Sequence, residues 1–129
     1  MKIWRFENDR KLVNKIYAIT RKEDFAKDFG LKDQIRRSSV SVMNDISEEF
    51  EGRTVTRCIE YLGVFKGSCG ETRWMLYVAL YCNYIDGKKF DDLYDITLTI
   101  SRKLHKFLAY VENYKSNDHV KEAVVKYQT

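Results

Sequence analysis

The sequence predicts an all-α protein, a single domain over residues 1–129 folded as an antiparallel up-and-down four-helix bundle. Apolar residues recur at helical spacing along four long segments, and the connections between these segments are short. The chain has no proline and only six glycines, which favours a few long helices over a loop-rich fold. Apolar residues make up 44% of the chain, enough for one packed core.

The first helix is predicted over residues 8–21, with Asn8 or Asp9 as its N-cap. Its core-facing stripe comprises Leu12, Ile16 and Ile19. Residues 22–30 form a charged linker with two phenylalanines, which we expect to close the end of the bundle; binding a ligand is the alternative. These two residues are Phe25 and Phe29.

The second helix is predicted over residues 31–50, where Asp33 stands four residues before Arg37 and can pair with it. Its apolar stripe comprises Leu31, Ile35, Val42, Ile46 and Phe50. Three small residues lie where a neighbouring helix could come close, namely Ser38, Ser39 and Ser41. Gly52 interrupts the pattern, and Thr54 is a plausible cap for the next helix.

The third helix is predicted over residues 54–84 and carries two stripes at the coiled-coil period. The core stripe comprises Cys58, Leu62, Phe65, Cys69, Thr72, Leu76 and Leu80. The second stripe comprises Gly63, Gly67, Gly70, Trp74, Tyr77 and Tyr81. Residues 74–85 are apolar on nearly every side, more than three partner helices in one monomer usually cover. We therefore predict that part of the second stripe, with helix one or four of a neighbouring copy, builds a closed ring.

The fourth helix is predicted over residues 90–114, with acidic residues at its start and basic residues later, an order that suits the helix dipole. Its stripe comprises Leu93, Ile96, Ile100, Leu104, Phe107 and Val111. The remaining residues, 115–129, are predicted either to dock as a short helix or to fray.

The cysteines and the N-terminus indicate a cytoplasmic protein. Cys58, Cys69 and Cys82 would all lie on one helix. An 11-residue step spans about 16 Å there, whereas bridged Cα atoms lie within about 7 Å. We therefore expect reduced thiols. The N-terminus lacks the apolar core of a signal peptide, and no segment has the length and apolarity of a membrane span.

The net charge of +4 is unevenly distributed: residues 1–22 carry +5, residues 23–85 carry −2, and residues 86–129 carry +1. Such an excess indicates either a solvated face or contact with a polyanion. The candidate nucleic-acid contacts are Arg10, Lys11, Lys15, Arg21, Lys22, Arg102, Lys103 and Lys106.

We predict neither catalysis nor a cofactor. The three glycines of the second stripe lie inside a helix, unlike those of a phosphate-binding loop. His105 and His119 have no partner at metal-ligand spacing, and the Glu-x-x-His pattern of diiron bundles does not occur. Each helical glycine costs about 1 kcal/mol relative to alanine, which close approach by another helix would offset.

Arg36 and Arg37 point about 100° apart on a helix, so only one should face inward. The structural interpretation is a buried polar link across the second and third helices, in which one arginine pairs with Asp45, Glu48 or Glu71. The functional interpretation is contact with phosphate.

Three segments carry a family resemblance. The run Gln34-Ile35-Arg36-Arg37-Ser38-Ser39-Val40-Ser41-Val42 resembles a Q-x-R-R-A-x-x-S-I motif; residues 45–48 resemble N-I-A-E, and residues 61–71 resemble F-L-x-x-A-x-G-S-x-x-E. These motifs are those of the four-helix bundle family encoded in intervening sequences of bacterial large-subunit ribosomal RNA genes. The chain departs from them at Met43, Asp45 and Glu49, where the family has proline, asparagine and glycine.

The resemblance implies a pentameric ring. It also implies kinship with the accessory variability determinants of diversity-generating retroelements, which bind a reverse transcriptase and nucleic acid. Two hypotheses follow: a homo-oligomeric module that binds structured RNA or DNA or a nucleoprotein, and a ring that recruits a protein without touching nucleic acid.

Overall fold

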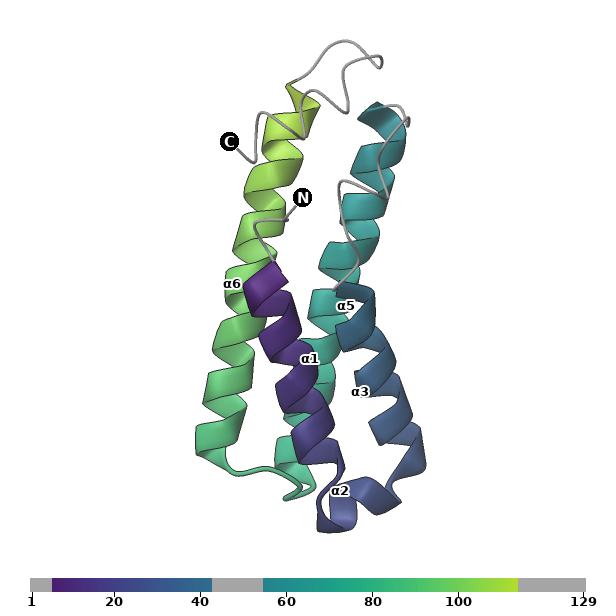
Figure 1. The fold of residues 1–129 in the computed structure, drawn as a ribbon, viewed down its shortest axis with the longest axis vertical. Helices are drawn as coiled ribbons and strands as arrows, with labels where there is room; N and C mark the ends of the chain where they lie inside the picture. Colours follow the sequence, from purple (N-terminus) through teal and green to yellow (C-terminus); the bar gives the residue numbers. More distant parts are fainter. Residues whose placement is uncertain (1–5, 43–54, 114–129) are drawn as a thin grey trace.

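The computed structural model describes residues 6–42 and 55–113 (Figure 1). Its helices are α1 (Phe6–Thr20), α2 (Glu23–Lys27), α3 (Phe29–Val42), α5 (Val55–Tyr81) and α6 (Gly87–Glu112). These two ranges contain no strand. The four long helices alternate in direction, so the predicted all-α bundle is confirmed, and the short α2 lies within the predicted linker.

The long helices pack in a closed order. α1 contacts α3 and α6, and α5 contacts the same two helices from the opposite side of the bundle. α5 and α6 have 27 and 26 residues, which correspond to about 40 Å. α1 and α3 have 15 and 14 residues. In Figure 1 the two shorter helices pack along one part of the long α5–α6 hairpin.

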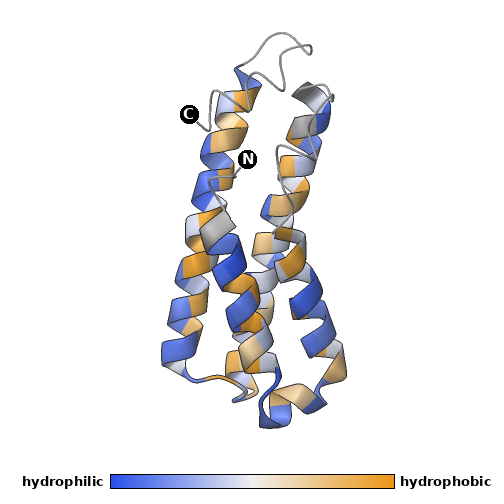
Figure 2. Ribbon diagram, in the orientation of Figure 1, coloured by the Kyte–Doolittle hydropathy of each residue, from blue (hydrophilic) through white to orange (hydrophobic). Residues whose placement is uncertain are grey.

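The predicted core stripes are confirmed wherever the structure describes them. Buried residues of α1 and α3 are Leu12, Ile16, Ile19, Ile35 and Val42. Buried residues of α5 and α6 are Leu62, Phe65, Cys69, Thr72, Leu76, Leu93, Ile96, Ile100, Leu104, Phe107 and Val111. Leu31 and Leu80 pack against this core while partly exposed. The remaining stripe positions, Cys58, Ile46 and Phe50, lie outside the described side chains. Figure 2 shows polar residues spread over α1, α3 and α6, with fewer on the middle of α5.

Two helices begin earlier than predicted, α1 at Phe6 rather than residue 8 and α6 at Gly87 rather than residue 90. α1 begins at Phe6, so Asn8 and Asp9 lie inside the helix and the predicted cap is wrong. Asp9 is fully buried one turn into α1. At α6 the N-cap is Asp86, whose carboxylate accepts a hydrogen bond from the Lys89 N–H at 2.8 Å.

α5 ends at Tyr81 rather than Tyr84 because the chain closes it with a Schellman motif. Asn83 adopts a left-handed conformation with φ of 62°. Its N–H donates to the Leu80 carbonyl at 3.0 Å, and the Tyr84 N–H donates to the Ala79 carbonyl at 2.9 Å. Asparagine tolerates this conformation better than most residues, which explains its place at the end of the helix.

The two linker phenylalanines differ in burial. Phe25 is 1% exposed and stacks on Tyr84 with ring centroids 5.0 Å apart, so it closes the bundle end as predicted. Phe29 is 72% exposed, with the Lys32 ammonium 4.9 Å from its ring centroid, so its predicted burial is wrong. Phe29 stands six residues before the buried Ile35, which places it about 120° from the inward face of α3.

The two cysteines described with their side chains should differ sharply in reactivity. Burial raises the pKa of the Cys69 thiol to about 12, a shift that the nearby Arg73 charge partly opposes and Asp9 reinforces. At pH 8 its thiolate fraction is then on the order of one in ten thousand. Cys82 is exposed.

In a Cys58→Ser background, Ellman's reagent should therefore modify one thiol of the native protein rapidly and the second only on unfolding. Adding Cys82→Ser should remove the rapid phase. Rapid modification of two thiols in the native protein would contradict the burial of Cys69.

Candidate functional site

The second stripe of α5 lies largely on the surface of the bundle. Trp74 is 68% exposed and Tyr81 76% exposed, and Gly63 and Gly67 are exposed beside Val64. Gly70 is half-buried. We define the α5 outer face as Gly63, Val64, Gly67, Gly70, Trp74 and Tyr81. Exposed apolar residues that gather on one face, unlike those scattered singly, are typical of an interaction site.

The described part of the bundle does not require the glycines of this face. Apart from the nearby backbone of α5 itself, a Cβ atom added at Gly63 or Gly67 would meet no atom of the described residues within 4 Å. At Gly70 its nearest neighbour would be the Arg73 guanidinium at 3.9 Å, an ordinary contact. Each glycine in a helix interior costs about 1 kcal/mol relative to alanine. Nothing within the described bundle offsets this cost.

Tyr77 belongs to the contact between α5 and α6 rather than to the α5 outer face. It is half-buried, with its ring centroid 4.9 Å from that of Phe90 and 5.7 Å from that of Tyr94. The predicted second stripe is therefore divided between intrachain packing and an open surface.

Arg36 and Arg37 point in different directions, and Arg36 contacts another helix. Arg36 faces α1: its Nε donates to the Thr20 hydroxyl at 2.8 Å, and its guanidinium lies 4.3 Å from the centroid of the Tyr17 ring. Arg37 is largely exposed and pairs with Asp33 at 3.2 Å, the predicted pair within the helix.

Of the three carboxylates predicted as alternative partners of the arginine pair, Glu71 is excluded by the structure. Arg37 and Glu71 line the same surface pocket between α3 and α5, but no ion pair between described residues joins either arginine to Glu71. Glu71 itself is exposed. The other proposed partners, Asp45 and Glu48, lie outside the described residues.

Hydroxyl groups supply the polar link between α3 and α5. The Ser38 and Thr72 hydroxyl oxygens are 2.8 Å apart, and the Ser68 hydroxyl donates to the Ser41 hydroxyl at 3.0 Å. Thr72 also donates to the Ser68 carbonyl of its own helix at 2.9 Å. Buried hydroxyls can satisfy their hydrogen bonds here without the desolvation cost of a charge. The predicted close approach of a neighbouring helix is confirmed at Ser38 and Ser41, whereas Ser39 donates to the Arg36 carbonyl of its own helix. The sequence signal for this contact was Thr72, a polar residue within the apolar stripe of the third helix.

The eight candidate basic residues do not form one continuous patch. Lys15 forms an ion pair with Asp92 of α6, which fixes the level at which the two antiparallel helices meet. From this level Arg10 lies about 7 Å along α1, and Arg102 lies about 15 Å along α6 in the same direction. Exposed Asp91 and Asp95 adjoin Asp92. Lys103 and Lys106 continue beyond Arg102, and Arg21 and Lys22 lie at the opposite end of α1.

Within residues 6–42 and 55–113, no helix combines the length and apolarity that crossing a membrane requires. The same part of the chain brings together no group of three histidine, cysteine, aspartate or glutamate side chains suited to a metal ion.

Comparison with known proteins places this bundle in a family. The family model described as 23S rRNA-intervening sequence protein matches residues 2–106. A protein of unknown function from the S23 ribosomal protein family of Bacteroides thetaiotaomicron VPI-5482 has a similar crystal structure, with a TM-score of 0.68. It is 20% identical over 81% of this chain and 94% of its own, a level that shows a shared fold. No curated protein matches the chain. The chain belongs to the 23S rRNA-intervening sequence protein family.

Proposed function

We propose that this protein is a self-assembling helical module, a closed homo-oligomeric ring, that binds structured RNA and catalyses no reaction. The observation that carries the proposal is the α5 outer face, where two exposed aromatic rings share one side of the helix with glycines that the described part of the bundle does not need. Against a second helix, these glycines would permit a close backbone approach, and burial of Trp74 and Tyr81 would supply the favourable energy.

A second copy of the chain is the occupant that this face suits best. None of its six residues carries a charge, so two copies can meet without repulsion between like charges. Aromatic residues are enriched in the cores of such interfaces, and charged residues are depleted there. Charged residues of both signs flank this face along α5, among them Lys66, Glu71 and Arg73, and could pair across the boundary between copies.

Light scattering at micromolar concentration tests the assembly. The expected mass is a multiple of 15.4 kDa. A single species of 15.4 kDa would rule out the ring.

The RNA component rests on the family and on exposed cations. The family description names an intervening sequence of 23S rRNA, and Arg10, Lys11, Arg102 and Lys106 are exposed. One chain with a net charge of +4 offers few phosphate contacts. Repetition of these residues around a ring would make the surface multivalent.

Titration of an RNA hairpin at about 50 and 200 mM salt tests this component. Affinity should fall about a thousandfold or more if six or more phosphates are contacted, because counterions are released on binding. Arg10→Glu/Lys11→Glu should abolish most binding. Lys27→Glu/Lys88→Glu makes the same change in charge at exposed positions elsewhere and should bind nearly as the wild type does.

Lys15 is left intact in these variants because it holds α1 to α6 through Asp92. Absence of binding at low salt, or equal losses in the two variants, would contradict the RNA component. The remaining function would then be recruitment of a protein by the oligomer.

A further inference from the structure

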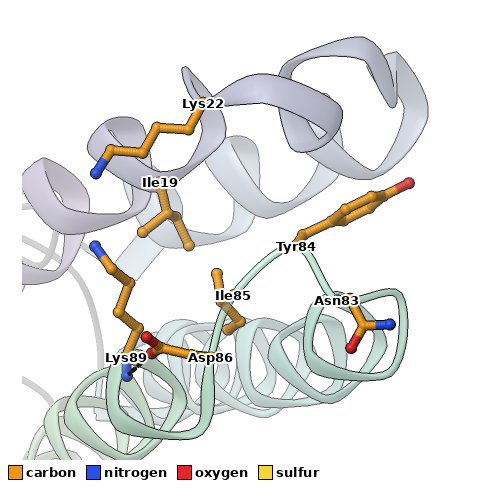
Figure 3. A pocket seen from close by; sticks show the side chains of 7 residues that line it. All are labelled: Ile19, Lys22, Asn83, Tyr84, Ile85, Asp86 and Lys89. Atoms are coloured by element: carbon orange, nitrogen blue, oxygen red, sulfur yellow. Dashed lines mark hydrogen bonds between the residues drawn. The ribbon is translucent and has the colours of Figure 1, made fainter.

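A pocket at the end of the bundle lies apart from the α5 outer face. It has a volume of about 320 Å³ and opens between the end of α1 and the turn that joins α5 to α6. Its lining residues are Ile19, Lys22, Asn83, Tyr84, Ile85, Asp86 and Lys89 (Figure 3). Pockets that hold small organic ligands are commonly of about 300–1,000 Å³.

Two cations gather at one end of this pocket. In Figure 3 the side chains of Lys22 and Lys89 extend from opposite walls and bring their ammonium groups to the same end. Neither lysine takes part in an ion pair with another described residue. Asp86 is the one acidic residue of the lining, and one of its carboxylate oxygens already caps α6 by accepting the Lys89 N–H. The lining therefore keeps a net positive charge, which favours an anion.

The middle of the pocket is apolar, and one of its aromatic walls is held in place. Ile19 and Ile85, 5% and 6% exposed, form its floor between the cationic end and the end at Tyr84. The Tyr84 ring is fixed by its stack on Phe25 and by donation of its hydroxyl to Asp28 at 2.9 Å. A ligand with an anionic group at one end and an apolar or planar body would match this pocket, because its cationic end is followed by an apolar floor and then by the Tyr84 ring.

The backbone on both sides of the pocket is constrained. Asn83 has φ of 62°, within the Schellman motif that ends α5. Glu23, directly after Lys22, has φ of 39°, a conformation that costs a residue with a Cβ atom about 1 kcal/mol or more. The Lys22 N–H also donates to the Ile19 carbonyl at 3.3 Å. Both lysines thus start from fixed backbone positions, which reduces the ordering cost of binding.

We propose that this pocket binds a nucleoside 5′-monophosphate, with the phosphate between Lys22 and Lys89 and the nucleoside over Ile19 and Ile85. A phosphate monoester carries a charge of about −1.5 to −2 at pH 7, which two lysines neutralise better than they would a single carboxylate. The amide of Asn83 offers both a donor and an acceptor for polar groups of the nucleoside. The ligand is either a free nucleotide or the 5′-phosphorylated end of an RNA strand. The proposal depends neither on ring assembly nor on Arg10, Lys11, Arg102 and Lys106, which lie outside the lining of this pocket.

Calorimetric titration of the full chain with adenosine 5′-monophosphate tests the site. Binding is expected, with adenosine and inorganic phosphate each at least about tenfold weaker, because each lacks one half of the contacts. Lys22→Gln and Lys89→Gln should each weaken binding at least about fivefold. The controls Lys27→Gln and Lys88→Gln remove exposed lysines outside the lining and should leave affinity unchanged.

A pair of short RNA strands separates the two sources of the ligand. If the pocket takes an RNA end, a strand with a 5′-phosphate should bind more tightly than the same strand with a 5′-hydroxyl, and Lys22→Gln should remove the difference. If it takes a free nucleotide, both strands should bind alike while the mononucleotide still binds. No heat with the mononucleotide at millimolar concentration, or equal losses in the lining and control variants, would overturn the proposal. So would binding of inorganic phosphate as tight as that of the nucleotide.

Discussion

A Gly67→Leu variant is expected to sediment as a folded 15.4 kDa monomer where the wild type forms an oligomer. The described residues leave open space around Gly67, because none of their atoms beyond the nearby α5 backbone lies within 4 Å of an added Cβ, so this part of the bundle can accept a larger side chain. Leucine is also the better helix former, by about 0.5–1 kcal/mol. The monomer should therefore gain stability while the close approach of a neighbouring helix is blocked.

The matched control is Gly87→Leu. Gly87 is also exposed and also has no atom within 4 Å of an added Cβ, but it begins α6 and does not belong to the α5 outer face. This variant should retain the wild-type mass. Light scattering gives the mass, and circular dichroism during urea unfolding gives the stability. Retention of the oligomer by Gly67→Leu would show that copies meet through another surface.

The part of this surface that could be predicted from sequence is the part set by helical periodicity. The spacing of apolar residues separates the core stripe from the second stripe of α5, and burial confirms the first. It could not divide the second stripe, because the half-buried position of Tyr77 depends on Phe90 and Tyr94 of another helix. The sequence pattern identified apolar positions, whereas the contact between helices decides which of them stay open.

The spatial arrangement of the basic residues could not be predicted from the sequence either. A charge count places an excess near the N-terminus and further lysines on α6, but the distance between these groups depends on how α1 and α6 align. The ion pair of Lys15 with Asp92 sets that alignment and brings acidic residues of α6 to the level of the α1 cations. Lys89 was absent from the predicted set, since only the tertiary fold brings it near Lys22.

The orientation of the arginine pair also depends on the tertiary fold. Helical geometry requires Arg36 and Arg37 to point in different directions, but it does not say which one faces inward or which helix it meets. The sequence interpretation expected a carboxylate partner on the second or third helix, namely Asp45, Glu48 or Glu71. The structure instead directs Arg36 toward a hydroxyl and an aromatic ring on α1.

Arg36→Ala is therefore expected to lower the free energy of unfolding by about 2 kcal/mol, and Arg37→Ala by no more than about 0.5 kcal/mol. The first change removes a charged hydrogen bond to the buried Thr20 hydroxyl, worth about 1.5–3 kcal/mol, and a cation–π contact with Tyr17. The second removes an exposed ion pair with Asp33, and such pairs contribute little. Urea unfolding at one fixed protein concentration measures both.

A double-mutant cycle with Thr20→Val distinguishes the contact with Thr20 from a general loss of packing. Thr20 is fully buried, and its hydroxyl both accepts from Arg36 and donates to the carbonyl of Ile16 at 2.8 Å. If the Arg36–Thr20 contact joins α1 to α3, the two changes should be less than additive, with a coupling of about 1 kcal/mol. The pair Arg37→Ala and Thr20→Val should add independently, because those side chains share no hydrogen bond. Equal coupling in the two cycles would mean that neither arginine joins α3 to α1.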